Sequence, residues 1–119
     1  MARSDFNMIP INHIFKENAP VITRHFPIEG TSPPVDDAYI LLQIQGVAAN
    51  HTLFINDQHI AGVALSPAPG STQAWRLSFS HIPPGILRSG DNTIRINRNP
   101  NAGDDFHVAW VVVNWRENS

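Results

Sequence analysis

The amino-acid sequence predicts an all-β protein in which two antiparallel sheets pack as a sandwich. Short apolar runs alternate with polar residues at the two-residue period of half-buried strands. The 119 residues include 10 Pro and 7 Gly, which separate these runs in the manner of turns. No longer segment shows the 3.6-residue apolar period of an amphipathic helix. About eight strands are expected, a number typical of a two-sheet sandwich of this length.

Residues 1–37 are expected to form two peripheral strands and a loop. The first strand is placed around Met8–Ile11 and the second at Val21–Phe26, which is flanked by prolines. Proline lacks the N–H group that a strand ladder needs, so strands that it flanks tend to lie at sheet edges. Residues 29–37 contain Gly-Thr-Ser-Pro-Pro and are expected to form a loop.

Residues 38–116 are expected to form the core of a single domain that spans residues 1–119. Residues 38–47 read as a strand in which Ile, Leu and Ile share one side. A hairpin follows, with its turn at Asn56-Asp57-Gln58. Residues 74–80 alternate large apolar and polar side chains, so the apolar side is expected to face the core.

The segment from Leu87 to Trp115 gives the clearest strand signals. Ser89–Asn92 is rich in turn-forming residues, and the next strand alternates Ile94 and Ile96 with polar residues. A polar loop covers residues 100–105. Phe106–Trp115 is too apolar and β-branched for an edge, so it is expected to be a central strand.

Composition and charge exclude several functional classes. Charged residues make up 15% of the chain and the formal charge is −2, whereas binding to nucleic acid requires a basic patch. The absence of Cys excludes disulfides and zinc-thiolate sites. The N-terminal sequence lacks the apolar segment of a signal peptide, and no run is long enough for a membrane-spanning helix. A cytoplasmic location, or export by another route, is therefore expected, without membrane insertion.

Three segments, in this order, follow a known pattern. Residues 53–62 read Leu-Phe-Ile-Asn-Asp-Gln-His-Ile-Ala-Gly, residues 75–87 begin with Trp and end with Leu, and residues 87–96 carry Gly90 and Asn92. They resemble the hairpin, aromatic strand and turn of the galactose-binding-domain-like jelly roll. That fold is the sugar-binding β-sandwich domain of β-galactosidase-like glycoside hydrolases and of carbohydrate-binding modules. Asp57 stands where Gly is usual, and Asp also tolerates the left-handed turn conformation.

The resemblance implies a jelly roll that binds carbohydrate through loops at one end of the sandwich. It covers residues 38 to about 115 and transfers no binding residue, because the family's loops vary. No catalytic barrel follows in the chain, and no acid/base pair, nucleophile motif or metal motif stands out, so no enzymatic activity is expected.

Polar side chains gather at the end of one strand, in the next loop and at the start of the last strand. Arg, Asn and Asp groups suit pairs of sugar hydroxyls because each offers two directed donors or acceptors. An ordinary solvated loop is the alternative interpretation. Arg98→Ala is expected to leave stability nearly intact and to weaken the binding of any ligand. The candidate ligand-binding residues are Arg95, Asn97, Arg98, Asn99, Asn101, Asp104, Asp105 and His107.

The three tryptophans are candidate platforms for a sugar ring, and a core position is the competing interpretation. Trp75 is in register with Leu77 and Phe79, and Trp110 with Phe106, so these two are expected in the core. Trp115 lies near the terminus and is retained as a candidate ligand-binding residue.

A structural calcium ion is a weaker expectation, and no other cofactor is expected. Calcium takes six to eight oxygen ligands, and such jelly-roll modules often hold one, by resemblance only. Asp36, Asp37 and Asp104 are the candidate ligands.

Two functions remain open. The first is a non-catalytic, lectin-like module that binds carbohydrate or a glycan surface. The alternative is a structural or assembly domain of a larger complex or homo-oligomer, without a small-molecule ligand, which the low charge and outward apolar residues such as Leu41, Phe54 and Val111 favour.

Overall fold

The computed structural model describes the backbone of residues 2–29, 35–60, 65 and 74–118, and their side chains except those of residues 2–4, 35–37, 117 and 118. This part of the chain forms eight strands and no helix, which confirms the all-β prediction. The strands are β1 (Ala2–Phe15), β2 (Val21–Ile28), β3 (Val35–Gln45), β4 (Thr52–Ile55), β5 (Gln58–His59), β6 (Arg76–Ile82), β7 (Gly90–Asn97) and β8 (Phe106–Asn118).

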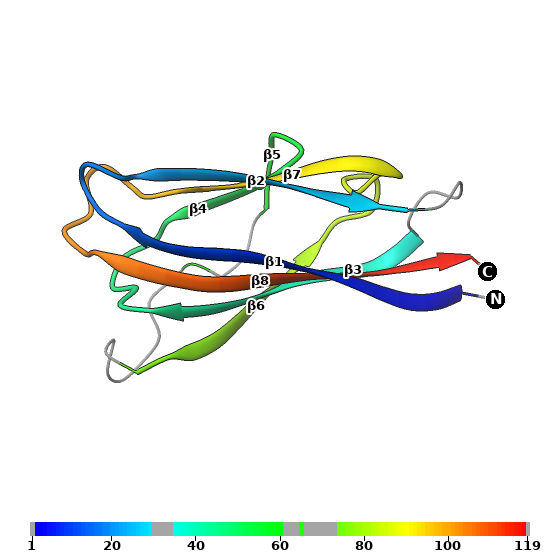
Figure 1. The fold of residues 1–119 in the computed structure, drawn as a ribbon, viewed down its shortest axis with the longest axis horizontal. Helices are drawn as coiled ribbons and strands as arrows, with labels where there is room; N and C mark the ends of the chain where they lie inside the picture. The colour runs from blue at the N-terminus through cyan, green and yellow to red at the C-terminus, as the bar shows by residue number, and fades with distance from the viewer. Residues whose placement is uncertain (1, 30–34, 61–64, 66–73, 119) are drawn as a thin grey trace.

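The strands pair into two antiparallel sheets of four, which Figure 1 shows as two layers. The first, here called the β8 sheet, has the order β1-β8-β3-β6, and the second, the β7 sheet, has the order β2-β7-β4-β5. The chain crosses between the sheets after nearly every strand, and only the β4–β5 hairpin stays within one. This strand order is that of an eight-stranded jelly roll, so the sandwich prediction is confirmed.

The core lies between the layers and is filled by inward side chains from both sheets. Ile40, Leu42 and Ile44 of β3 are fully buried, and Ile94 and Ile96 of β7 are at most 1% exposed. Burying a side chain of this size stabilises the fold by roughly 1.5–3 kcal/mol. The predicted alternation of β7 is therefore confirmed.

The first two strands lie at sheet edges, yet they belong to the core. Ile9, Ile11 and Phe15 of β1 and Phe26 and Ile28 of β2 are at most 5% exposed. The sequence predicts peripheral strands here; both strands end a sheet, and their inward side chains still take part in the core. β1 is also longer than predicted, because it pairs with β8 along nearly its whole length, from Ala2 opposite Asn118 to Phe15 opposite Phe106. The two ends of the chain therefore lie side by side (Figure 1).

A β-bulge in β8 decides which of its side chains face the core. Trp110 and Val108 pair with Gln43 and Ile44 of β3, which are consecutive, so Ala109 is an extra residue on β8. An extra residue moves all following side chains to the opposite side of the sheet.

The bulge reverses the predicted roles of two tryptophans. Before it, Phe106 and Val108 face the core; after it, Val111 and Trp115 do, with Trp115 only 4% exposed. Trp115 is therefore a core residue and not a sugar platform. Trp110 is half-buried on the outside of the sheet and not in the core as predicted.

β6 presents its polar side to the core. Ser78 and Ser80 are buried, whereas Leu77 and Phe79 are 63% and 65% exposed. The prediction that the apolar side of this strand, including Trp75, faces inward is wrong. Alternation identifies only which residues share a side of the strand. Ser78 pairs with Leu42 and Ser80 with Ile40, so the small serines lie beside large inward side chains of β3, and this pairing decides which side faces the core.

One of two predicted turns is confirmed. Asn56 and Asp57 have φ values of 52° and 63°, the left-handed conformation expected for this hairpin. The other, predicted at Ser89–Asn92, ends earlier than expected, because Gly90, Asp91 and Asn92 already belong to β7 and pair with β2. The side chain of Asn92 is completely buried and holds the turn before β7: its Oδ1 accepts from Arg88 N, and its Nδ2 donates to the carbonyl oxygens of Arg88 and Gly90.

Candidate functional site

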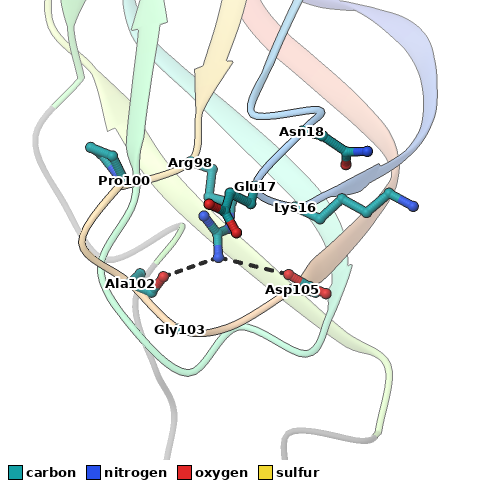
Figure 2. Close-up of a pocket in the computed structure, with 8 residues that line it drawn as sticks. All are labelled: Lys16, Glu17, Asn18, Arg98, Pro100, Ala102, Gly103 and Asp105. Carbon is teal, nitrogen blue, oxygen red and sulfur yellow. Dashed lines mark hydrogen bonds and ion pairs between the residues drawn. The ribbon is translucent and has the colours of Figure 1, made fainter.

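A polar pocket of about 750 Å³ opens at one end of the sandwich, between the β1–β2 turn and the β7–β8 loop (Figure 2). A backbone hydrogen bond of 2.7 Å from Arg98 N to Pro20 O ties the loop to the end of the turn. The pocket is the place where the predicted polar cluster meets other segments. Its lining residues are Lys16, Glu17, Asn18, Arg98, Pro100, Ala102, Gly103 and Asp105.

Arg98 holds the β7–β8 loop in shape. Its side chain is 7% exposed, and its Nε donates to Asp104 O at 2.9 Å while its Nη2 donates to Ala102 O at 3.0 Å. Asp105 Oδ1 lies 3.7 Å from Nη2, and Figure 2 shows Arg98 between Ala102 and Asp105. A buried guanidinium with these partners is a structural anchor, so the expectation that its loss leaves stability intact does not fit the structure.

His51 and Asp104 form a buried pair behind the same loop. His51 Nδ1 accepts a hydrogen bond of 3.0 Å from Asn99 N, so Nε2 carries the proton and donates to Asp104 Oδ2 at 2.8 Å. Asp104 Oδ2 also accepts from Ala48 N at 2.8 Å and Ala49 N at 3.2 Å. The pair therefore joins the β3–β4 connection to the β7–β8 loop.

These contacts determine the ionisation of Asp104. Burial by itself would raise the pKa of this carboxyl group. The hydrogen bonds from His51 and Ala48 outweigh that cost and hold the pKa of Asp104 below its ordinary value of 3.8. Asp104 is therefore an ionised structural acceptor at neutral pH.

The loop brings together only part of the predicted ligand-binding set. Arg98, Asn99, Asp104 and Asp105 are close, and Asn101 lies exposed in the same loop. Of these, the pocket is lined only by Arg98 and Asp105.

The remaining predicted residues lie elsewhere. Arg95 is on the outside of the β7 sheet, where it pairs with Asp57 at 3.0 Å and lies 4.4 Å from the ring centroid of Phe54. Asn97 is half-buried on the same strand. His107 is on the β8 sheet, with its ring centroid 4.8 Å from that of Trp75.

A calcium site receives no support from the residues whose side chains are described. They contain no group of three or more His, Asp or Glu side chains placed to hold a metal. Asp104 Oδ2 is occupied by three donors, and the side chains of Asp36 and Asp37 lie outside the described set. The groups of the pocket that can meet a ligand are those of Lys16, Glu17, Asn18 and Asp105.

A second candidate site covers the outer side of the β8 sheet. Outward side chains of all four strands stand in register as three rows across the sheet, which together are here called the outer face. The middle row is apolar throughout, and no Asp, Glu, Lys or Arg belongs to any of the rows. From β6 to β1, the rows are His81, Tyr39, Asn114 and Phe6; Phe79, Leu41, Val112 and Met8; and Leu77, Gln43, Trp110 and Pro10.

The outer face is hollowed and exposed. Tyr39, Leu41, Phe79 and His81 line a hollow of about 570 Å³. Phe6 and Met8 at the other edge of the sheet are 63% and 57% exposed. Large apolar side chains are thus in contact with water on both edge strands of the β8 sheet.

The opposite outside of the molecule is mostly polar, although Val21 of β2 is 48% exposed there. The β7 sheet presents Thr23, His25, Asp91, Thr93 and Arg95 to solvent, and His25 Nδ1 lies 2.9 Å from Asp91 Oδ2. Its outward aromatic ring, Phe54, is covered by Arg95. The two outsides of the sandwich therefore differ in chemical character.

Sequence reasoning missed both the outer face and the buried pair. The sequence predicts Leu77 and Phe79 in the core and Val111 on the outside, whereas Leu77 and Phe79 are exposed and Val111 is fully buried. His51 lies 53 residues from Asp104 in the chain, so no local pattern links them. The alternation of apolar and polar residues in residues 74–82 predicts a strand with one apolar side. It does not show whether that side faces the core or the solvent.

Among the residues that the structure describes, no helix has the length and apolarity that crossing a membrane requires.

Comparison with solved structures supports the fold. Dimeric latent PorU from Porphyromonas gingivalis contains a region similar to 98% of this chain, with a TM-score of 0.70 and 10% sequence identity. The chain spans 13% of the length of that protein. At this level of identity, the likeness concerns the fold alone.

Comparison of sequences identifies the family. No curated protein matches the chain. A family of unknown function, DUF7383, matches residues 9–117. The chain belongs to this family, DUF7383.

Proposed function

We propose that the chain is a non-catalytic association domain that docks onto another protein through the outer face of its β8 sheet. One observation carries the proposal: this face is apolar across four strands, while the outside of the β7 sheet is mostly polar. Large apolar patches on the surface of a soluble domain mark sites of interaction.

The size of the patch supports a protein partner. Among the described side chains, seven large ones on the β8-sheet side are 39% to 65% exposed: Phe6, Met8, Ile14, Tyr39, Trp75, Leu77 and Phe79. At roughly 150–250 Å² for each large side chain, they expose on the order of 600 Å² of mostly apolar surface. The half-buried residues of the face add to this area, which approaches the roughly 800 Å² per partner of a stable interface.

The chemistry of the face also supports a protein over other partners. Nucleic acid requires Arg and Lys, and the face has neither. An interface core is depleted of charge and enriched in Phe, Tyr, Trp and Met, as this face is. The buried serines of β6 indicate that these apolar residues are not needed to fill the core of the sandwich.

A photo-crosslinking experiment tests the proposal. With p-benzoylphenylalanine at the position of Phe79, irradiation in the native cells is expected to link the chain covalently to a partner. The same group at Thr23, exposed on the β7 sheet, serves as the matched control and is expected to give no specific adduct. No adduct from the outer face, or equal adducts from both positions, would refute the proposal.

Carbohydrate binding is a second candidate, favoured by the polar pocket at the end of the sandwich. Glu17, Asn18 and Asp105 offer acceptors and donors there, and the Asp105 side chain is 62% exposed. Glycan-array screening followed by calorimetric titration is expected to give binding that Asp105→Ala weakens. No response from folded protein on either test would remove this candidate.

A further inference from the structure

We infer that the partner of the outer face is a second copy of this chain, bound face to face across a two-fold axis. The inference rests on the proposed association function and specifies its partner. Three properties of the face support it: its neutrality, its internal arrangement and its area.

The face can meet itself without electrostatic repulsion. Its three rows hold no Asp, Glu, Lys or Arg. In a two-fold interface each surface packs on an identical surface, so any charge near the axis would face its own copy. Asp57, Asp91, Arg95 and the other exposed charges of the β7 sheet lie on the opposite side of the sandwich.

The residues of the face are arranged in a self-complementary way. A half-turn about the centre, between Leu41 and Val112, exchanges most positions with ones of like character: Tyr39 with Trp110, Asn114 with Gln43, and Phe79 with Met8; the exception is the corner pair His81 and Pro10. Two copies can stack face to face with the two-fold axis parallel to the strands or perpendicular to them. Because of this internal arrangement, the two orientations bring similar residues into contact. In both cases the apolar middle row packs on the middle row of the other copy.

Polar groups find partners in the same arrangement. With the axis along the strands, Tyr39 of one copy lies opposite Asn114 of the other, and Gln43 lies opposite Trp110. With the axis across the strands, Tyr39 lies opposite Gln43 and Trp110 opposite Asn114. Each phenol or indole group thus faces an amide oxygen that can accept its hydrogen bond. The free-energy cost of burying an unpaired donor is therefore avoided.

The area is sufficient for a stable dimer. Each copy would cover on the order of 600 Å² from its most exposed side chains, and the half-buried residues between them contribute further. That total lies near the roughly 800 Å² per partner of standard interfaces. Two sheets that pack in this way lie about 10 Å apart, as the sheets do within the sandwich.

The test measures the mass of the purified chain by analytical ultracentrifugation over a concentration series. The wild-type chain is expected to form a dimer, and Phe79→Glu is expected to be monomeric, because the new carboxylate would be buried without a partner. Thr23→Glu, on the polar β7 sheet, is the control and is expected to remain dimeric. Circular dichroism of all three shows whether they stay folded, as the exposure of Phe79 predicts.

A second measurement locates the contact. The chain has no Cys, so Leu41→Cys provides a single thiol next to the centre of the face. A bismaleimide with a spacer of about 10 Å, the separation of packed sheets, is expected to link two copies of this variant. The corresponding variant Thr93→Cys on the β7 sheet is expected to remain unlinked.

The outcomes separate this inference from the proposed function. A monomeric wild type, or a dimer that Phe79→Glu leaves intact, overturns the second copy as partner. If the photo-adduct at Phe79 then has the mass of one chain plus a different protein, the association function stands with another occupant. If no adduct forms either, both are wrong.

Discussion

Arg98 lies at the start of the β7–β8 loop, where its guanidinium donates to the carbonyl oxygens of Ala102 and Asp104. Arg98→Ala would leave these acceptors without their donor and create a void in a nearly closed site. We expect it to lower the free energy of unfolding by about 2–4 kcal/mol, measured by urea denaturation.

Arg95→Ala is the matched control for Arg98→Ala. Arg95 is paired with Asp57, whose side chain is 83% exposed, and exposed ion pairs contribute at most about 1 kcal/mol. If Arg95→Ala lowered the free energy of unfolding as much as Arg98→Ala, Arg98 could not be singled out as the structural anchor.

Asp104 makes the free energy of unfolding depend on pH under acidic conditions. Its pKa is lower in the folded chain than its ordinary value of 3.8, so the unfolded state binds more protons in that range. The stabilising contribution is therefore complete above the unfolded pKa and is lost as the pH falls through the folded pKa. We expect stability to decline on acidification below about pH 4.

Asp104→Asn tests the source of that decline. The amide does not titrate, so the variant is expected to be less stable at neutral pH and to lose less stability on acidification than the wild type. Parallel curves of unfolding free energy against pH for the two chains would show that other carboxylates cause the effect.

At the level of elements, the bulge at Ala109 determines which side chains of β8 enter the core. Deleting Ala109 would move the inward side chains of β8, either before or after this position, to the solvent side of the sheet. Because Phe106, Val108, Val111, Val113 and Trp115 are all buried, we expect the deletion variant to be unfolded by circular dichroism. Ala109→Ser retains the extra residue and is expected to remain folded, and a folded deletion variant would show that the bulge can migrate.

Strands and turns could be predicted from sequence because their signals are local. Alternation located β7, apolarity placed β8 inside its sheet, and Asn56 and Asp57 marked a turn through their tolerance of positive φ. The direction in which β6 faces could not be predicted. A two-residue period defines two sides, and only the pairing of Ser78 and Ser80 with β3 selects between them.

The candidate sites were predictable to a smaller degree. The polar β7–β8 loop was identified, since Asn, Asp and Arg cluster there in the sequence. The anchoring role of Arg98 and its neighbour pair, His51 and Asp104, depends on segments that only the fold brings together. The outer face depends on register across four strands, which no single stretch of sequence contains.

At the level of the whole molecule, the two outsides of the sandwich differ: the three rows of the outer face hold no charged side chain, with Arg116 lying beyond them on β8, whereas the β7 sheet presents Asp91 and Arg95. A contact through the apolar outside should not depend on ionic attraction. We expect the dissociation constant of the dimer to change little between about 0.05 and 1 M sodium chloride, a range over which exposed charges become screened.

Sulfate provides the complementary measurement, because it is excluded from protein surfaces and strengthens apolar contacts. Ultracentrifugation in sodium sulfate is expected to show tighter association than in sodium chloride of equal ionic strength. Dissociation by sodium chloride would point to the charged β7 sheet as the contact.

The pairing of Ala2 with Asn118 places the two ends of the polypeptide about 5 Å apart, on neighbouring strands. A linker of a few residues is therefore enough to close the chain into a ring, and the bond between Asp57 and Gln58, both exposed, offers a place to open new termini. For the same reason the whole sandwich can be inserted into a surface loop of a host protein without forcing the two sides of that loop apart.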